Sequence, residues 1–276
     1  MTTGRFFAGL GKAVLLLVFT AFVMGPIAAT VLGGFKSAGD LRTNPLGLPA
    51  AWGTQVYTDL ISDPKFWSYL WSSLVISVTA VVLTLIVAAA AAYVFAQIRF
   101  FGGRFLQAYL LLGLVFPFAT AILPLFITVR NLGLLDTHWA VILPQSAFGL
   151  SLAILLFKTF FDQLPKELFE AAYVEGCGYI RFFWRFTLPL STPILATVGV
   201  FVFVQSWNNF LLPLIVLNSR EIYTWPLGMM QFRGEHLVEW NKTLAFISLT
   251  LVPAIVFFLA AQRYIVAGLT GGAVKG

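Results

Sequence analysis

Charge is scarce in this sequence. Only 10% of its 276 residues are Asp, Glu, Lys or Arg, whereas a soluble domain carries about 25%. Cysteine and histidine are also rare: the chain has one cysteine, Cys177, and its two histidines, His138 and His236, lie far apart. These counts exclude an intrachain disulfide and leave no local spacing that predicts a metal site.

Long hydrophobic runs take the place of charge. Six runs approach the ~20 residues that a helix needs to cross a bilayer, and each lacks Asp, Glu, Lys and Arg: residues 13–32, 70–96, 105–129, 139–157, 194–217 and 244–261. The first run is longer than the ~7–15 residues of a signal-peptide core, so we expect it to stay uncleaved. The sequence therefore predicts an all-α integral membrane protein with six transmembrane helices, in one domain over residues 1–276.

The few charged residues are distributed unevenly between the two sides of the membrane that these runs would span. Six crossings place both termini on one side. That side holds ten Lys and Arg against four Asp and Glu, whereas the opposite side holds seven of each kind. Cytoplasmic loops carry an excess of Lys and Arg, so we expect both termini in the cytoplasm. The basic residues are scattered along the chain, which argues against nucleic-acid binding.

Several functional signals are missing. No predicted span contains Asp, Glu, Lys or Arg, the residues on which ion-coupled carriers depend. The chain lacks the G-x-x-x-x-G-K-[ST] phosphate-binding loop, and no group of acids, histidines and serines suggests catalysis. We expect a transporter component that is not an enzyme, binds no cofactor itself and draws its energy from a partner.

The longest predicted cytoplasmic loop, residues 158–193, has the composition of a folded segment. Pro165 suits the first position of a helix, and residues 166–175 are mostly good helix formers before Gly176 ends the helix. One side of this helix carries four residues spaced i, i+3, i+4 and i+7: Leu168, Ala171, Ala172 and Glu175. The two adjacent alanines make a narrow face that a cleft of another protein can approach closely.

Two short runs in this loop carry a family resemblance. Residues 170–176 read EAAYVEG and residues 188–193 read LPLSTP. Together they resemble the EAA loop of binding-protein-dependent ABC importer permeases, in which EAA is followed by Gly and later by an apolar-Pro pair. Glu175 stands where Asp is usual in that family. The resemblance implies that a cytoplasmic ATPase is contacted by Glu170, Ala171, Ala172, Glu175, Gly176, Leu188 and Pro189.

The resemblance covers nearly the whole chain and points most closely to the six-helix second permease subunit of maltose-type sugar importers. Four stretches carry it: residues 35–57, 206–214, 225–228 and 262–276. Two positions depart from the family pattern, because Asn209 stands where Asp is frequent and Ser72 where Asn is common. A permease for another solute, such as a polyol, glycerol phosphate or a polyamine, is the alternative within the same family.

The resemblance also implies partners and a location. The chain would form a heterodimer with a second homologous permease in the inner membrane, on two copies of a cytoplasmic ABC ATPase that hold Mg-ATP. An extracytoplasmic solute-binding protein would deliver the sugar. The tail, residues 262–276, looks too rich in small residues to be another helix. It resembles the extension that reaches the ATPase interface in maltose-type importers, here through Gly268, Gly271 and Gly272.

Polar residues inside the predicted spans mark a candidate substrate path, because such groups are costly in lipid unless they face protein or water. Five of them are consecutive in the fifth run: Gln205, Ser206, Trp207, Asn208 and Asn209. They fit a sugar path, with Trp207 stacking on a ring, and they fit hydrogen bonding between helices equally well. Phe116 and Pro117 fit a gate or a simple kink, and Gln145 fits the path or helix packing. Residues 88–92, all alanine, predict a close packing face.

Overall fold

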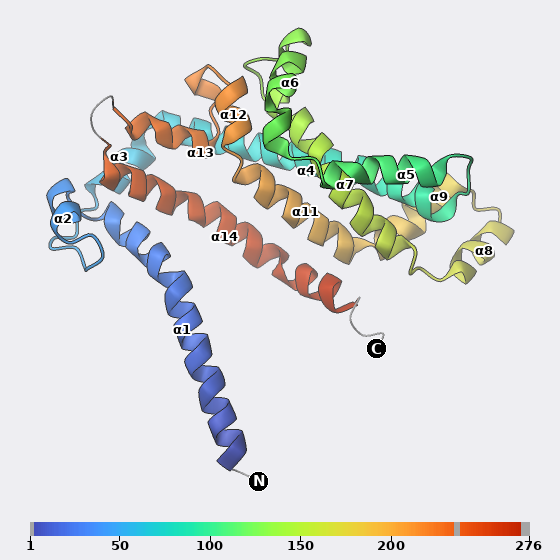
Figure 1. Ribbon diagram of the computed structural model, residues 1–276, viewed down its shortest axis with the longest axis horizontal. Helices are drawn as coiled ribbons and strands as arrows, with labels where there is room; N and C mark the ends of the chain where they lie inside the picture. The colour runs from blue at the N-terminus through green and yellow to red at the C-terminus, as the bar shows by residue number, and fades with distance from the viewer. Residues whose placement is uncertain (1–2, 235–237, 272–276) are drawn as a thin grey trace. The chain divides into compact units, whose positions relative to one another are not determined.

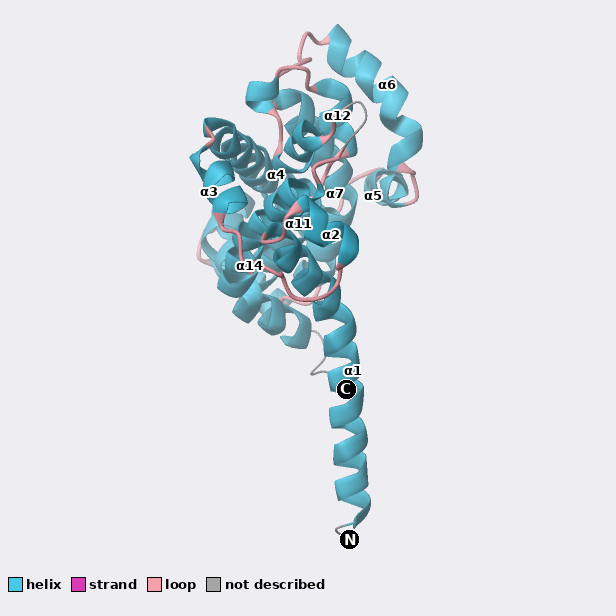
Figure 2. Cartoon of the chain, turned by 90° about the vertical axis from the view of Figure 1, so that its left-hand side faces the viewer, coloured by secondary structure: helices cyan, strands magenta, loops and turns pink. Residues whose placement is uncertain are grey.

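The computed structural model describes residues 3–234 and 238–271, and this part of the chain is helical. Figure 2 shows helices joined by loops; the described residues form no β-strand, only an isolated antiparallel bridge between Arg233 and Val238. The predicted all-α class is confirmed. The chain divides into two compact units: unit 1 comprises residues 1–67 and 229–253, and unit 2 comprises residues 68–228 and 254–276.

Unit 1 is built from two separate stretches of the chain. Its elements are α1 (Thr3–Gly34), α2 (Ala38–Thr43), α3 (Gln55–Ser62), the start of α4 (Pro64–Gln97), η4 (Met229–Phe232) and the first part of α14 (Trp240–Gly271) (Figure 1). The Tyr57 hydroxyl ties α3 to two other helices, because it donates to the Val31 carbonyl at 2.9 Å and shares a 2.9 Å hydrogen bond with Ser248 Oγ. Gly34 permits close packing of α1 on α14, since a Cβ there would lie 2.8 Å from the Ala245 Cα.

Lys36 is a buried cation just after α1. The residue is 2% exposed, and its Nζ donates to the Asn44 carbonyl at 2.6 Å and to the Pro45 carbonyl at 3.3 Å. An ammonium group is expensive to bury unless it is hydrogen-bonded. These two bonds therefore fix the segment that follows α2 to the end of α1.

Unit 2 holds the remaining elements and the ends of α4 and α14. In chain order they are α5 (Gly103–Leu111), η1 (Leu112–Leu114), α6 (Phe118–Asn131), α7 (Trp139–Phe161), α8 (Lys166–Val174), α9 (Tyr179–Phe182), η2 (Phe183–Thr187), α10 (Leu188–Leu190), α11 (Thr192–Trp207), α12 (Leu211–Val216), η3 (Arg220–Ile222) and α13 (Trp225–Gly228).

The core of unit 2 lies between α4, α7 and α11, which run side by side in Figure 1. The contributions of α4 include Ala88, Ala89 and Ala92, each at most 1% exposed. They pack with Phe157 of α7 and Val198 of α11. The alanine run thus forms the close packing face expected from the sequence, because small side chains let helix backbones approach.

Two of the six predicted spans are not continuous helices. The run 105–129 is divided at residues 115–117. The helix before the break, formed by α5 and η1, makes an angle of 103° with α6. The run 194–217 is divided between α11 and α12 by residues 208–210. Four helices of the described chain are long and apolar enough to span a membrane: those of residues 10–34, 64–97, 139–161 and 240–259. Two bent helix pairs pass the same test, residues 103–114 with 118–131 and residues 179–190 with 192–207, and counting each pair as one span gives up to six.

The expectation that the tail after Arg263 is not helical is wrong. α14 continues to Gly271, so Gly268 and Gly271 are part of a helix, whereas Gly272 lies outside the described residues. A helix that has already formed adds one hydrogen bond for each further residue without a new nucleation cost. Small residues can therefore extend α14 although they would not start a helix by themselves.

Asp136 joins the loop before α7 to the chain after α12. Its carboxylate accepts hydrogen bonds from the Asn218 and Ser219 backbone N–H groups, both at 2.8 Å, and from the Ser219 hydroxyl. Its own N–H donates to the Val216 carbonyl at 2.9 Å. Hydrogen bonds to the ionised form lower the pKa of the Asp136 carboxyl, and the Ser219 hydroxyl has the largest effect.

This lowered pKa predicts a pH-dependent stability. The contribution of Asp136 should be complete above its ordinary pKa of 3.8 and lost as pH falls through the lower folded-state value. Asp136→Asn should lower the melting temperature by about 3 °C at pH 7 and flatten this acid dependence. Glu221→Gln also removes a charge in this segment. It should change neither the melting temperature at pH 7 nor its dependence on acid pH. Equal melting temperatures for wild type and Asp136→Asn at pH 7 would contradict the assignment.

Candidate functional site

The loop helix α8 begins at Lys166, one residue later than expected, with Pro165 in the N-cap position. Glu167 lies in the first turn, where a carboxylate interacts favourably with the helix dipole. The helix ends in the hydrogen-bond pattern of a Schellman motif. The Gly176 N–H donates to the Tyr173 carbonyl at 3.0 Å, and the Cys177 N–H donates to the Ala172 carbonyl at 2.9 Å.

Gly176 adopts a backbone conformation that this motif requires. Its φ is +77°, the left-handed region in which other L-residues lose about 1–2 kcal/mol. A Cβ at this position would meet no atom within 4 Å. The requirement for glycine is therefore one of backbone conformation, while the space around Gly176 stays free for a partner.

Aromatic side chains hold α8 against the core of unit 2. The Phe169 ring lies 5.1 Å from the Tyr179 ring and 5.0 Å from the Phe182 ring, measured between centroids. Ala172 and Leu188 are half-buried and pack on the same core cluster as Phe169. α8 therefore packs on the same core cluster as α4, α7 and α11.

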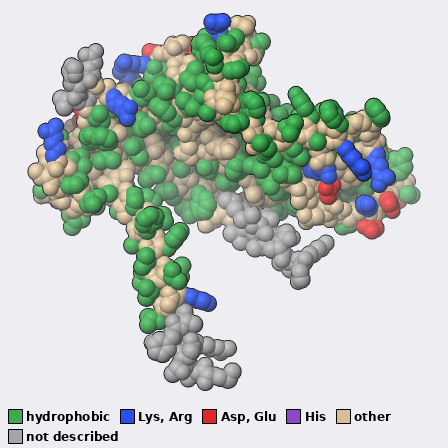
Figure 3. Space-filling model, viewed as in Figure 1, with side chains coloured by type: hydrophobic (Ala, Val, Ile, Leu, Met, Phe, Trp, Pro, Cys, Tyr) green, Lys and Arg blue, Asp and Glu red, His purple; other side chains and the backbone are tan. Residues whose placement is uncertain are grey.

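The opposite side of α8 is exposed. Glu170 and Ala171 are exposed, and so is Glu175 at the C-cap. Gly176 and, in α10, Pro189 are exposed as well. The expected alanine pair is thus divided, because Ala171 faces outward and Ala172 packs inward. On the face drawn in Figure 3, charged side chains of both signs gather at the end of unit 2 that carries α8 and α9. Large apolar side chains are exposed at the same end, among them Val174 at 84% and Ile180 at 79%.

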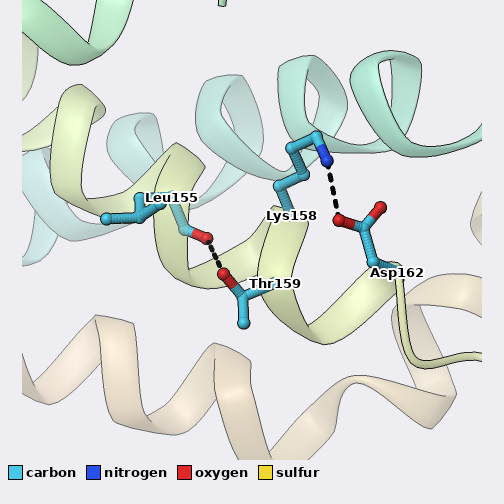
Figure 4. Close-up of polar contacts among 4 residues, drawn as sticks. All are labelled: Leu155, Lys158, Thr159 and Asp162. Carbon is cyan, nitrogen blue, oxygen red and sulfur yellow. Dashed lines mark hydrogen bonds and ion pairs between the residues drawn. The ribbon is translucent and has the colours of Figure 1, made fainter.

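The end of α7 that leads into α8 is held by local bonds. Lys158 Nζ lies 2.6 Å from Asp162 Oδ2, and the Thr159 hydroxyl donates to the Leu155 carbonyl at 2.8 Å (Figure 4). An exposed ion pair at this spacing contributes only about 0.3–0.5 kcal/mol. It helps α7 to continue to Phe161, beyond the predicted boundary at residue 157.

A second candidate site is a cavity of about 380 Å³ in unit 2. It lies among η1, α6, α7 and α11 and has the following lining residues: Gly113, Leu114, Phe118, Gln145, Phe148, Gly149, Leu152, Phe201, Val202, Gln205, Ser206 and Asn209. The Phe118 and Phe148 rings meet edge to face with centroids 4.9 Å apart. Amides, a hydroxyl and aromatic rings thus share one cavity, and its lining carries no charged residue.

Two residues that line this cavity are joined by a hydrogen bond between their side chains. The Ser206 hydroxyl of α11 donates to Gln145 Oε1 of α7 at 2.6 Å. The Gln145 Nε2 is buried and has no hydrogen-bond partner among the described residues. A buried unpaired amide is costly, so this side chain retains a donor for water or a ligand. Asn209 Oδ1 accepts from the Leu212 N–H at 3.2 Å and helps to begin α12.

Other residues of the predicted path lie elsewhere. Trp207 is 4% exposed and packs between the rings of Phe203 and Trp225, with centroids 5.5 and 5.8 Å away. Asn208 bonds back to the Val204 carbonyl of its own helix. Phe116 and Pro117 lie at the break before α6 and do not line the cavity. Three further lining residues, Phe148, Gly149 and Phe201, were not predicted, because their only sequence signal is their presence in apolar helices.

The described residues contain no group of three His, Cys, Asp or Glu that could hold a metal ion. Cys177 is buried in the turn after α8. His138 is half-buried at the start of α7, where Nε2 lies 3.2 Å from the Ser72 hydroxyl and burial lowers the pKa of the imidazole. These residues therefore have packing contacts and form no reactive cluster.

Comparison with known proteins identifies the class of this membrane protein. Residues 80–271 match the family described as binding-protein-dependent transport system inner membrane components. The chain belongs to this family of ABC importer permeases, as the EAA loop predicted, and its relatives are named as permease subunits rather than enzymes.

Two curated relatives and one solved structure are similar over most of the chain. The diacetylchitobiose uptake system permease NgcG of Streptomyces coelicolor is 31% identical over 99% of this chain and 91% of its own length. The trehalose/maltose transport system permease MalG of Thermococcus litoralis is 34% identical over 80% of both chains. A bacterial ABC transporter involved in alginate import has the same fold, with a TM-score of 0.83, 22% identity and coverage of 96% of this chain and 99% of that one.

Proposed function

We propose that this chain is the permease subunit of an ATP-driven importer for a di- or oligosaccharide. The observation that carries the proposal is α8, an exposed helix with the EAA sequence that is packed on the core of unit 2. The names of the relatives support a saccharide, since they transport diacetylchitobiose and trehalose or maltose.

In this proposal α8 is the coupling helix. Glu170, Ala171 and Glu175 contact a cleft of a cytoplasmic ATPase, and Gly176 turns the chain behind the helix. ATP-driven closure of two ATPase subunits moves α8 as a rigid body. Because Phe169 and Ala172 pack against the cluster formed by α4, α7 and α11, the movement reaches the membrane helices. Mg-ATP stays on the ATPase, and Gly268 and Gly271 of α14 contribute to the same interface.

The cavity in unit 2 is proposed as this subunit's part of the sugar path. Gln145, Gln205, Ser206 and Asn209 supply hydrogen-bonding groups for hydroxyls, while aromatic rings can cover the apolar face of a sugar. Glycerol phosphate or a polyamine would need a compensating charge, and the lining has none. This absence favours a neutral solute, such as a sugar or a polyol, over glycerol phosphate or a polyamine.

The proposal is tested by purifying the tagged chain in mild detergent from its own cells and identifying co-purifying proteins by mass spectrometry. We expect a P-loop ATPase and a second permease. Reconstituted with the cognate binding protein in liposomes, the complex should take up an oligosaccharide only when ATP is present. A chain that purifies alone and transports without ATP would contradict the proposal.

A second test concerns the cavity. Gln145→Leu combined with Ser206→Ala removes the hydrogen bond between α7 and α11 and two groups for sugar hydroxyls. Because each lost hydrogen bond costs about 1 kcal/mol, removing both groups should raise the KM for sugar uptake by roughly 30-fold, with little change in basal ATP hydrolysis. Asn208→Ala, which alters an exposed side chain outside the lining, should leave the KM unchanged. An unchanged KM in the double variant would exclude this cavity from the path.

A further inference from the structure

The turn between α4 and α5 borders a second cavity, of about 670 Å³, which is open to the surface and lies entirely within unit 2. Two arginines face it from opposite sides of the turn: Arg99 just after the end of α4, and Arg104 in the first turn of α5. Phe95, Phe100 and Phe105 provide apolar walls. This cavity is separate from the proposed sugar path and from α8, since it shares no residue with either.

Both arginines lack a carboxylate partner. The ion pairs among the described residues are Lys158 with Asp162 and Lys242 with Glu239, and no acidic residue lines this cavity. The first turn of α5 contains no acid, and Gly102 gives it no side-chain cap. The positive end of the α5 dipole and two guanidinium groups therefore all lie at one cavity without a compensating anion.

The surroundings of the cavity are those of a membrane interface. α4 is an apolar helix of 34 residues that ends at Gln97, and α5 begins the next apolar segment. The rings of Phe101 and Phe105, 105% and 77% exposed, lie beside the arginines in the sequence. Aromatic and basic residues at the end of a span are placed at the level of the lipid headgroups.

We propose that this cavity binds the phosphate group of an anionic phospholipid. The Arg99 and Arg104 guanidinium groups and the N-terminus of α5 hold the phosphate, which Arg can bind through two parallel hydrogen bonds. The exposed phenylalanines contact the glycerol and upper acyl region. A free phosphate would satisfy the same positive groups but would make no contact with Phe101 and Phe105. The geometry therefore favours a lipid.

The test uses the whole transporter complex in nanodiscs of phosphatidylcholine with or without phosphatidylglycerol, followed by native mass spectrometry of the retained lipid. Wild type should retain phosphatidylglycerol in preference to phosphatidylcholine. Arg99→Gln with Arg104→Gln should lower this retention by about tenfold. Lys12→Gln, which removes an exposed basic residue near the N-terminal end of another span, should leave it unchanged. Arg99→Lys with Arg104→Lys, which keeps the charge and loses the fork geometry, should give an intermediate value.

Three outcomes would overturn the proposal. Equal phosphatidylglycerol retention in wild type and the double Gln variant would exclude the cavity. Displacement of the lipid by inorganic phosphate at the same concentration would identify a phosphate site. Loss of the ATPase from the double Gln variant with the lipid still bound would identify an acidic protein surface as the occupant.

Discussion

Gly176→Val should reduce ATP-dependent uptake by at least about tenfold while the protein remains in the membrane. The φ of +77° at this residue costs an L-residue about 1–2 kcal/mol, and a β-branched residue is less tolerant still. The end of α8 would open and lose the hydrogen bond from the Cys177 N–H to the Ala172 carbonyl. The coupling face would then no longer be rigid, so ATP hydrolysis should continue without its stimulation by sugar and the binding protein.

Gly178 provides a matched control for this prediction. It lies two residues further along, its φ is −71°, and a Cβ there would also meet no atom within 4 Å. Gly178→Ala should therefore keep wild-type uptake, whereas Gly176→Ala should be impaired. Full uptake by Gly176→Val, at normal membrane abundance, would mean that the turn after α8 does not serve coupling.

Lys36→Met should destabilise the segment after α2 by about 2–3 kcal/mol. The substitution keeps an unbranched side chain of similar length but leaves the Asn44 and Pro45 carbonyls without their donor, and unpaired carbonyls cost about 1–3 kcal/mol each. Limited proteolysis measures the effect, because trypsin can cut after Arg42, an exposed residue of α2. Cleavage at this bond should become at least about tenfold faster.

Lys65→Met is the control for the Lys36 variant, since Lys65 is an exposed lysine in the first turn of α4. It should not change the cleavage rate after Arg42. If Lys36→Met is cut no faster than wild type, the two hydrogen bonds to Asn44 and Pro45 contribute nothing to the order of this segment.

The class of fold could be predicted because hydropathy reports directly on the solvent that surrounds a helix. α1, α4, α7 and α14 all lie where long apolar runs predict them. The breaks at residues 115–117 and 208–210 could not be found in this way, because the runs stay apolar across them. Pro117, which has no N–H to donate, and the pair Asn208 and Asn209 were the local signs of these breaks.

The candidate sites were predictable to different degrees. The EAA pattern located α8 because spacing along one helix is a local property that the sequence contains. The cavity depends on α7 and α11 lying side by side, which the sequence does not specify. Trp207 illustrates the difference: its indole packs on Phe203 and Trp225, and only the tertiary structure reveals that it does not line the cavity.

The breaks in the third and fifth runs have a consequence for hydration. Backbone groups that leave a helix inside a bilayer must be satisfied by protein or water, since hydrocarbon offers no hydrogen bonds. The bend of 103° before α6 and the interruption after α11 therefore mark places from which lipid has to be kept away. In the proposed importer, the second permease subunit covers these breaks and completes a water-filled path.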